Sequence, residues 1–169
     1  MFLRFYKRFR LKKIVKKSFS ESQRQISEIK IKSVALLVDG NSIKATHEFI
    51  GLIENQGLNV KAFVLTKDKK AENTEKITYF LSGDIDADGR IKNADLKGKF
   101  LNSYDLLINY YEESITELLY LSSISKAGFR AGFKQGQIIL NDLMIDVDMS
   151  EYPTFVDELF KYLKNFNKI

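Results

Sequence analysis

The chain contains no cysteine and only one histidine among its 169 residues. The absence of cysteine excludes disulfides, thiolate metal sites and thiol nucleophiles, and it fits a reducing compartment, so we expect a cytoplasmic protein. Because His47 is the sole histidine, a Ser-His-Asp or Cys-His triad has little support, and we expect His47 at the boundary of the core. An enzyme built on this sequence would depend on carboxylates, lysine, arginine or tyrosine.

Long apolar runs are also missing. The longest uninterrupted run covers residues 34–38, far short of the roughly 20 residues that a transmembrane helix needs. The N-terminus carries the cations of a secretory signal, but no apolar segment of about 7 to 15 residues follows them. We therefore expect neither a signal peptide nor a transmembrane segment.

Positive charge is concentrated at one end of the sequence. Residues 1–32 hold 11 Lys or Arg residues against two acidic residues, a formal charge of +9, whereas the whole chain carries +5. Residues 33–169 therefore carry a formal charge of −4. Because attraction to phosphate is gathered in one segment, we expect a basic N-terminal arm, residues 1–30, to dominate any contact with an anionic partner.

From residue 31 onward, buried β-like runs alternate with amphipathic helix patterns, which predicts a single α/β domain over residues 31–169. The expected strands cover residues 33–38, 60–65, 77–81, 104–110, 129–133 and 138–147, with a turn at Gly136 between the last two. The expected helices cover residues 43–56, 93–102, 114–125 and 152–166, with Ser114 as an N-cap and Pro153 in the last helix's first turn. The predicted architecture is a Rossmann-like or flavodoxin-like three-layer sandwich with a mostly parallel sheet.

The basic arm changes its helical face partway along. On a helical wheel, aromatic residues up to Phe9 lie opposite the first cations, but beyond Arg10 the apolar and cationic sides exchange places. The arm is therefore two short amphipathic pieces, either joined by a bend near Arg10 or contacting two different surfaces. Its predicted anion-binding residues are Arg4, Lys7, Arg8, Arg10, Lys12, Lys13, Lys16 and Lys17.

Three interpretations of the arm remain open. Cations beside phenylalanine and tyrosine suit RNA or a ribosomal surface, where rings stack on unpaired bases. The same composition suits an anionic membrane surface, where aromatic rings enter the headgroup region. Alternatively, the arm is a helix that covers the sheet and exposes solvated lysines.

Polar residues at strand ends are the candidate ligand-binding residues, because parallel sheets bind ligands beyond the carboxyl ends of their strands. Asp39, Asn41 and Ser42 follow the first expected strand, and Tyr110 ends the clearest one. The segment from Asp39 to Ser42 lacks both the G-x-G-x-x-G turn and the P-loop lysine pattern. The alternative is that Asn41 or Ser42 merely caps the following helix.

An aspartate-rich segment has the spacing of a calcium loop. Residues 84–95 carry oxygen ligands at positions 1, 3, 5 and 12 and a glycine at position 6, so the segment resembles an EF-hand or dockerin loop. The predicted side-chain ligands are Asp84, Asp86, Asp88 and Asp95. No second loop pairs with it and a strand precedes it, so a solvated acidic loop is the alternative. We expect no cofactor, and calcium is the one exception for which the sequence offers a pattern.

Arg130 lies between two glycines, Gly128 and Gly132, in the segment Ala-Gly-Phe-Arg-Ala-Gly-Phe. Neighbouring glycines allow close backbone approach, so this arginine could grip a phosphate or carboxylate in a bidentate fashion. The alternative is an arginine bound to a local carboxylate or strand end.

Three segments, residues 104–111, 127–133 and 141–145, together with the basic start, resemble a small bacterial family of unknown function about as long as this chain. That resemblance implies one protein of this size and assigns no catalytic residue. Residues 104–133 are also weakly similar to the acceptor-side domain of heptosyltransferases, which implies a Rossmann-like sheet but not sugar transfer.

The sequence favours a non-enzymatic cytoplasmic binding protein. Its arm would contact RNA, a ribosome or anionic lipid, the last implying a peripheral position at the inner membrane, while the body supplies protein or small-ligand contacts. The alternative is a small nucleotide- or sugar-phosphate-binding enzyme, with Asp39, Asn41 and Arg130 arranged around a phosphate.

Overall fold

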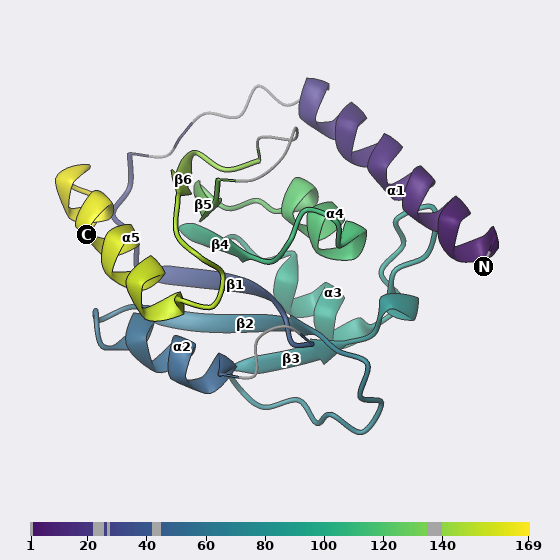
Figure 1. Ribbon diagram of the computed structural model, residues 1–169, viewed down its shortest axis with the longest axis horizontal. Helices are drawn as coiled ribbons and strands as arrows, with labels where there is room; N and C mark the ends of the chain where they lie inside the picture. Colours follow the sequence, from purple (N-terminus) through teal and green to yellow (C-terminus); the bar gives the residue numbers. More distant parts are fainter. Residues whose placement is uncertain (1, 22–25, 27, 42–44, 135–139) are drawn as a thin grey trace.

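The computed structural model describes residues 2–21, 26, 28–41, 45–134 and 140–169. Its centre is a sheet of six parallel strands in the order β3-β2-β1-β4-β5-β6 (Figure 1). The strands are β1 (Ser33–Asp39), β2 (Asn59–Leu65), β3 (Ile77–Phe80), β4 (Leu106–Tyr110), β5 (Phe129–Phe133) and β6 (Leu143–Ile145). This is the strand order of Rossmann-type sheets. The first three strands are added toward one edge of the sheet and the last three toward the other, so the order switches between β1 and β4. The predicted α/β fold with a mostly parallel sheet is therefore confirmed.

The helices are α1 (Phe2–Glu21), α2 (Thr46–Glu54), α3 (Ala94–Phe100), α4 (Thr116–Ile124) and α5 (Tyr152–Asn165), with a short 3₁₀ turn η1 (Ser82–Asp84). Helices α2 and α5 pack on one face of the sheet, and α3 and α4 pack on the other. Helix α1 lies along the outer side of α4, so it adds a partial fourth layer to the predicted three (Figure 1).

The central strands are apolar on both faces because helices cover both. In β1, the five residues 34–38 are all buried, and alternate side chains contribute to the two separate cores. A continuous apolar run of this kind is typical of a buried parallel strand, whereas an exposed strand would alternate. Asp39, the last residue of β1, follows Ala35 and Leu37 on the face covered by α3 and α4. Its side chain therefore lies on that face, at the end of the sheet where the strands finish.

The core beneath α2 and α5 is built around aromatic rings. Phe49, Tyr110, Phe133 and Phe155 contact one another, with ring centroids 4.6 Å apart for Phe49 and Tyr110 and 5.0 Å apart for Tyr110 and Phe155. Edge-on ring pairs of this kind add about 0.5–1.5 kcal/mol each beyond their buried area. Tyr110 is thus a central packing residue.

Helix α1 is one uninterrupted helix that passes through Arg10 without a break. Leu11 and Val15 are fully buried in the core shared with α3 and α4, and Ile14 packs partly against it. Of the two predicted possibilities, a bend near Arg10 is therefore wrong, and the helix instead contacts two different surroundings along its length.

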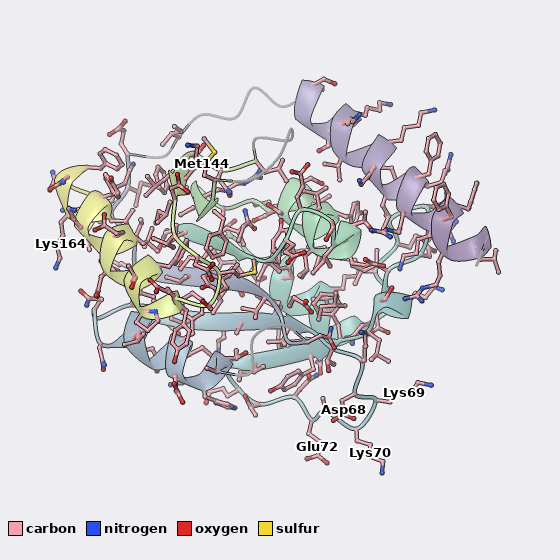
Figure 2. The ribbon with its side chains drawn as sticks, in the orientation of Figure 1. Asp68, Lys69, Lys70, Glu72, Met144 and Lys164 are labelled. Atoms are coloured by element: carbon pink, nitrogen blue, oxygen red, sulfur yellow. The ribbon has the colours of Figure 1, made fainter. Side chains whose placement is uncertain are left out.

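The connection from β2 to β3 contains no helix. It runs along β3, where the side chain of Asn73 accepts a hydrogen bond from the backbone N–H of Tyr79 at 2.8 Å. This contact uses a donor on the free edge of an edge strand and so discourages pairing with another chain. The labelled side chains Lys69 and Lys70 project from the outside of this connection (Figure 2).

Several expected boundaries shift. Ser114 is not an N-cap, because α4 begins at Thr116 after Ile115, which makes no side-chain cap hydrogen bond. Helix α2 begins at Thr46, after Ala45. The last strand is shorter than expected, and the predicted turn at Gly136 lies outside the described residues.

Candidate functional site

Helix α1 has two faces, and each changes character along its length. The inner face, directed at the body, carries cations in its first half and apolar side chains in its second: Arg4, Lys7, Arg8, Leu11 and Val15. The outer face carries aromatic side chains first and lysines afterwards: Phe5, Tyr6, Phe9, Lys12, Lys13 and Lys16. Members of each set recur three or four residues apart, so they share one side of a helix. The exchange of sides at Arg10 thus has a structural reason, since polar and apolar parts of the body meet the same helix in turn.

Lys7 is the central inner cation. Its Nζ lies 2.8 Å from Glu117 Oε1 and donates to both the carbonyl and the hydroxyl of Ser82. The hydroxyl of Ser82 in turn donates to Glu117 Oε1 at 2.5 Å. Burial raises the pKa of Glu117, but the hydrogen bonds from Lys7 and Ser82 and the charge of Lys7 outweigh burial, so the pKa lies below its ordinary value. Glu117 is therefore a buried, ionised anchor for α1.

Two arginines hold the same helix by weaker contacts. Arg8 donates from Nη2 to the backbone carbonyl of Ser114 at 2.9 Å. Arg10 Nη2 lies 2.6 Å from Asp88 Oδ1, and both side chains are partly exposed. Asp88 sits in a small hairpin closed by the antiparallel bridge between Ile85 and Ile91. These contacts commit Arg8 and Arg10 to the body.

The outer face is open to solvent. Phe5 is 76 % exposed and Phe9 is 64 % exposed, and Leu3 beside them is 80 % exposed. The cations Lys12, Lys13 and Lys16 are exposed as well, and none of them forms an ion pair with a described residue. Lys17 is exposed too, although it has an interaction within the chain. The outer face therefore combines large apolar groups with uncompensated positive charge.

A cavity of about 1000 Å³ lies beneath the N-terminal half of α1. Its walls come from the carboxyl ends of β1 and β2, from η1, and from the segment between β4 and α4. We call it the α1 cavity and define it by Arg4, Phe5, Lys7, Arg8, Asp39, Asn41, Leu65, Thr66, Lys67, Ser82, Ser114, Ile115 and Glu117. It includes the edge between β1 and β4 where the strand order reverses, the usual ligand position in open parallel sheets.

Asp39 and Asn41, two of the predicted ligand-binding residues, line this cavity. Asp39 Oδ1 accepts hydrogen bonds from the backbone and side-chain nitrogens of Asn41, at 3.1 and 2.8 Å, so Asn41 orients the carboxylate instead of capping a helix. Gly40 between them permits a close approach to β2, because a Cβ there would lie 2.5 Å from Val64 Cγ1. Ser42, the third residue predicted in this turn, lies outside the described residues.

The other two predicted ligand-binding residues lie elsewhere. Tyr110 is buried on the opposite face of the sheet, where its hydroxyl donates to the carbonyl of Met149 at 2.7 Å. Arg130 is buried on the α4 face and donates from Nη2 to the carbonyl of Ser125, just beyond the end of α4, at 2.8 Å. The structure thus does not bring Tyr110 and Arg130 to Asp39. The carbonyl that Arg130 binds follows a helix, so this contact is neither the local carboxylate nor the strand end of the alternative prediction.

The four aspartates of the calcium-like segment have separate partners. Asp84 accepts from the backbone N–H of Leu81, Asp86 from two backbone N–H groups of its own turn, and Asp88 binds Arg10. Asp95 lies in the first turn of α3 and accepts from Asn73. In the part of the chain that the structure describes, no three acidic or histidine side chains are grouped to hold a metal ion. Calcium binding by this loop stays a prediction without geometric support.

Sequence reasoning missed several residues of the α1 cavity. No motif in the sequence singles out Glu117, because its role depends on a lysine 110 positions away. Lys67 lies two residues beyond the end of β2, as Asn41 lies two residues beyond the end of β1, so the strand-end rule that selected Asn41 also points to Lys67. His47 is exposed on α2 and does not line the α1 cavity, so the expected position at the boundary of the core is wrong.

The fold and the cavity define this chain as an α/β protein with a Rossmann-type strand order, in which an N-terminal helix covers the carboxyl edge of the sheet. The chain belongs to a family of unknown function, DUF6913, whose model matches residues 7–166. The match includes most of α1, and it confirms the predicted resemblance to a small family of that kind.

No curated protein and no solved structure matched the chain. The predicted local similarity to heptosyltransferases therefore gains no support and assigns no residue a role.

Proposed function

We propose that the protein binds an anionic membrane surface through the outer face of α1. The observation that carries this proposal is the order of exposed groups on one helix. The aromatic side chains of Phe5 and Phe9 precede lysines that form no ion pair with any described residue, Lys12, Lys13 and Lys16, on the same side. A helix lying in the headgroup region needs this combination, since rings enter the acyl boundary while ammonium groups meet phosphates.

Magnitudes support stable attachment. Transfer of a phenylalanine from water into an apolar environment contributes about 1.5–3 kcal/mol, and each lysine near an anionic surface contributes about 1 kcal/mol. Two such rings and three lysines therefore supply roughly 6 kcal/mol or more before the entropic cost of binding. No helix in the described part of the chain has the length and apolar content to cross a bilayer, so the attachment proposed is peripheral.

Lipid fits the outer face better than RNA does. Leu3, the most exposed of the large apolar side chains, inserts into lipid but offers no ring for base stacking. The arginines Arg8 and Arg10, whose planar groups suit base recognition, are not on the outer face, because Arg8 lines the α1 cavity and Arg10 binds Asp88. The cations of the outer face are lysines, which suit diffuse attraction to a charged surface.

Liposome co-sedimentation of the full chain tests the proposal. Vesicles with about a third anionic lipid should bind the protein, and purely zwitterionic vesicles should bind it weakly. Phe5→Ser with Phe9→Ser should weaken binding by roughly 100-fold, since about 3 kcal/mol is lost. The matched control is Tyr162→Ser with Phe166→Ser, an exposed ring pair on α5 that should leave binding unchanged.

Charge is tested separately by replacing Lys12, Lys13 and Lys16 together with glutamate, with Lys69→Glu, Lys70→Glu and Lys164→Glu combined as the control of equal charge change. Only the first set should abolish salt-sensitive binding. If the outer-face variants bind anionic vesicles as well as the wild type does, or if they lose binding to single-stranded RNA alone, the proposal is wrong. Truncation of the arm is unsuitable, because Leu11 and Val15 belong to the core.

A further inference from the structure

We propose that the α1 cavity binds a small phosphorylated molecule that also carries hydroxyl groups, of the size of a sugar phosphate or a nucleoside monophosphate. This site lies beneath the inner face of α1, and of the residues that line it Phe5 alone also belongs to the outer face. The cations of the site, Arg4, Arg8 and Lys67, lie off the outer face, so ligand binding here does not require membrane binding. Its volume of about 1000 Å³ is at the upper end of the range for small-molecule sites, and it leaves room for a ligand of this size.

Charge is the first argument. Four cations line the cavity, Arg4, Lys7, Arg8 and Lys67, against two carboxylates, Asp39 and Glu117. Lys7 is paired with Glu117, but Arg4 and Lys67 form no ion pair with any described residue. The cavity wall therefore keeps an excess of positive charge, which favours a dianionic phosphate.

Geometry is the second argument. Arg4 and Arg8 come from α1 and Lys67 comes from the end of β2, so the cations approach the cavity from its roof and from its floor. Arg8 uses Nη2 to bind the carbonyl of Ser114, and a guanidinium has further N–H donors that remain for a ligand. Donors arriving from two sides can surround a tetrahedral phosphate, whereas a flat patch contacts one side only.

The remaining polar groups select what the phosphate is attached to. Asp39 places a carboxylate at the carboxyl end of β1, where Asn41 fixes its orientation. A carboxylate accepts hydrogen bonds from hydroxyl groups and repels a second anion, so the end of the cavity near Asp39 suits the hydroxyls of a sugar. Ser82 and Thr66 add hydroxyl groups to the lining. The segment around Gly40 has no P-loop pattern, so a triphosphate lacks its usual backbone cradle.

The test is a ligand panel measured by thermal shift and titration calorimetry on the full chain. The probes are inorganic phosphate, ribose 5-phosphate, glucose 6-phosphate and AMP, with ribose, glucose and adenosine as matched molecules without phosphate. At a ligand concentration about 100 times Kd, we expect the melting temperature to rise by roughly 5–10 °C. The phosphorylated compounds should raise it and their unphosphorylated counterparts should not. A larger rise with the sugar phosphates than with AMP would identify a sugar phosphate as the ligand class, and the reverse would identify a nucleoside monophosphate.

Variants locate the site without disturbing the fold. Arg4→Ala and Lys67→Ala should each weaken binding about tenfold or more, because each removes a charged hydrogen bond to the ligand. The controls are Lys69→Ala and Lys70→Ala in the same connection as Lys67, and the outer-face variant Lys13→Glu, all of which should bind as the wild type does.

The proposal is overturned if no phosphorylated probe binds at millimolar concentration, or if Arg4→Ala and Lys67→Ala bind a probe with wild-type affinity. Equal binding of a sugar and its phosphate would also overturn it. Because Lys13→Glu weakens membrane attachment but not this site, failure of one proposal is separable from failure of the other.

Discussion

Replacing Lys7 by methionine should destabilise the protein in a strongly pH-dependent manner. The substitution keeps an unbranched side chain against the body but removes the ammonium group that lies 2.8 Å from Glu117 Oε1. Glu117 is then a buried carboxylate that keeps the hydrogen bond from Ser82 and a longer one, of 3.3 Å, from Thr116. Removal of one partner of a buried ion pair costs about 3–5 kcal/mol, and we expect about 3 kcal/mol at pH 7.5 because Ser82 remains.

The sign of the pH dependence follows from the pKa of Glu117. In the wild type this pKa lies below its ordinary value, so the carboxylate contributes stability that is complete above the unfolded-state pKa of about 4.3 and is lost as the pH falls. Without Lys7, burial dominates and the pKa rises above that of the unfolded chain. The variant therefore loses stability as the pH rises above about 4.3, by up to 1.36 kcal/mol per pH unit.

Urea denaturation at pH 4.0, 5.5 and 7.5 measures this difference. The gap between wild type and Lys7→Met should be widest at pH 7.5 and should shrink to roughly 1 kcal/mol or less at pH 4.0. Lys7→Met combined with Glu117→Gln should recover most of the loss at pH 7.5, since no buried charge is left. The matched control is Arg10→Met, which breaks a solvent-exposed pair with Asp88 and should cost far less than Lys7→Met does at pH 7.5. An equal loss at all three pH values, or a loss no larger than that of Arg10→Met, would refute the role assigned to Glu117.

Three further substitutions test the packing and hydrogen bonding of the body. Leu11→Ala should lower the free energy of unfolding by about 2–5 kcal/mol in urea denaturation, because the side chain is fully buried; a surface-like loss below 0.5 kcal/mol would mean that α1 is not docked. Gly40→Ala should cost about 1–3 kcal/mol in the same assay, since the added Cβ would lie 2.5 Å from Val64 Cγ1, and a neutral effect would contradict that close approach. Asp105 is a carboxylate whose pKa burial raises but three hydrogen bonds from neighbouring donors, two of them in Ser33, bring below its ordinary value. Its stabilisation is therefore complete above about pH 4 and lost on acidification, so Asp105→Asn should unfold more readily at pH 7 but approach the wild type near pH 2, and unchanged stability at pH 7 would contradict this.

The fold was largely predictable because local pattern and tertiary role agree in the sheet. The run of residues 34–38 has to be covered on both faces, and helical patterns separate most of the strands, so a parallel α/β sheet follows. The connection from β2 to β3 departs from this rule, since it crosses over without a helix. Strand order depends on which strands pair, and no local pattern determines that.

The candidate site was only partly predictable. The strand-end rule selected Asp39 and Asn41, which line the α1 cavity, but it also selected Tyr110, because the rule does not say to which face a strand's last residue points. Successive side chains of a strand point to opposite faces of the sheet, and Tyr110 points into the aromatic core instead of the cavity. The pairing of Lys7 with Glu117 joins residues distant in sequence, so no motif or spacing reveals it.

Helix α1 is shared by two surfaces, and this has a thermodynamic consequence. Its outer face is exposed, while its inner face forms the roof of the cavity. A ligand in the proposed cavity site would touch both the helix and the body, so its binding would favour the docked position of α1 on α4. The outer face is already exposed when the helix is docked, so a membrane gains no contact with the body there. Docking of α1 would therefore respond to the ligand of the cavity and not to the membrane.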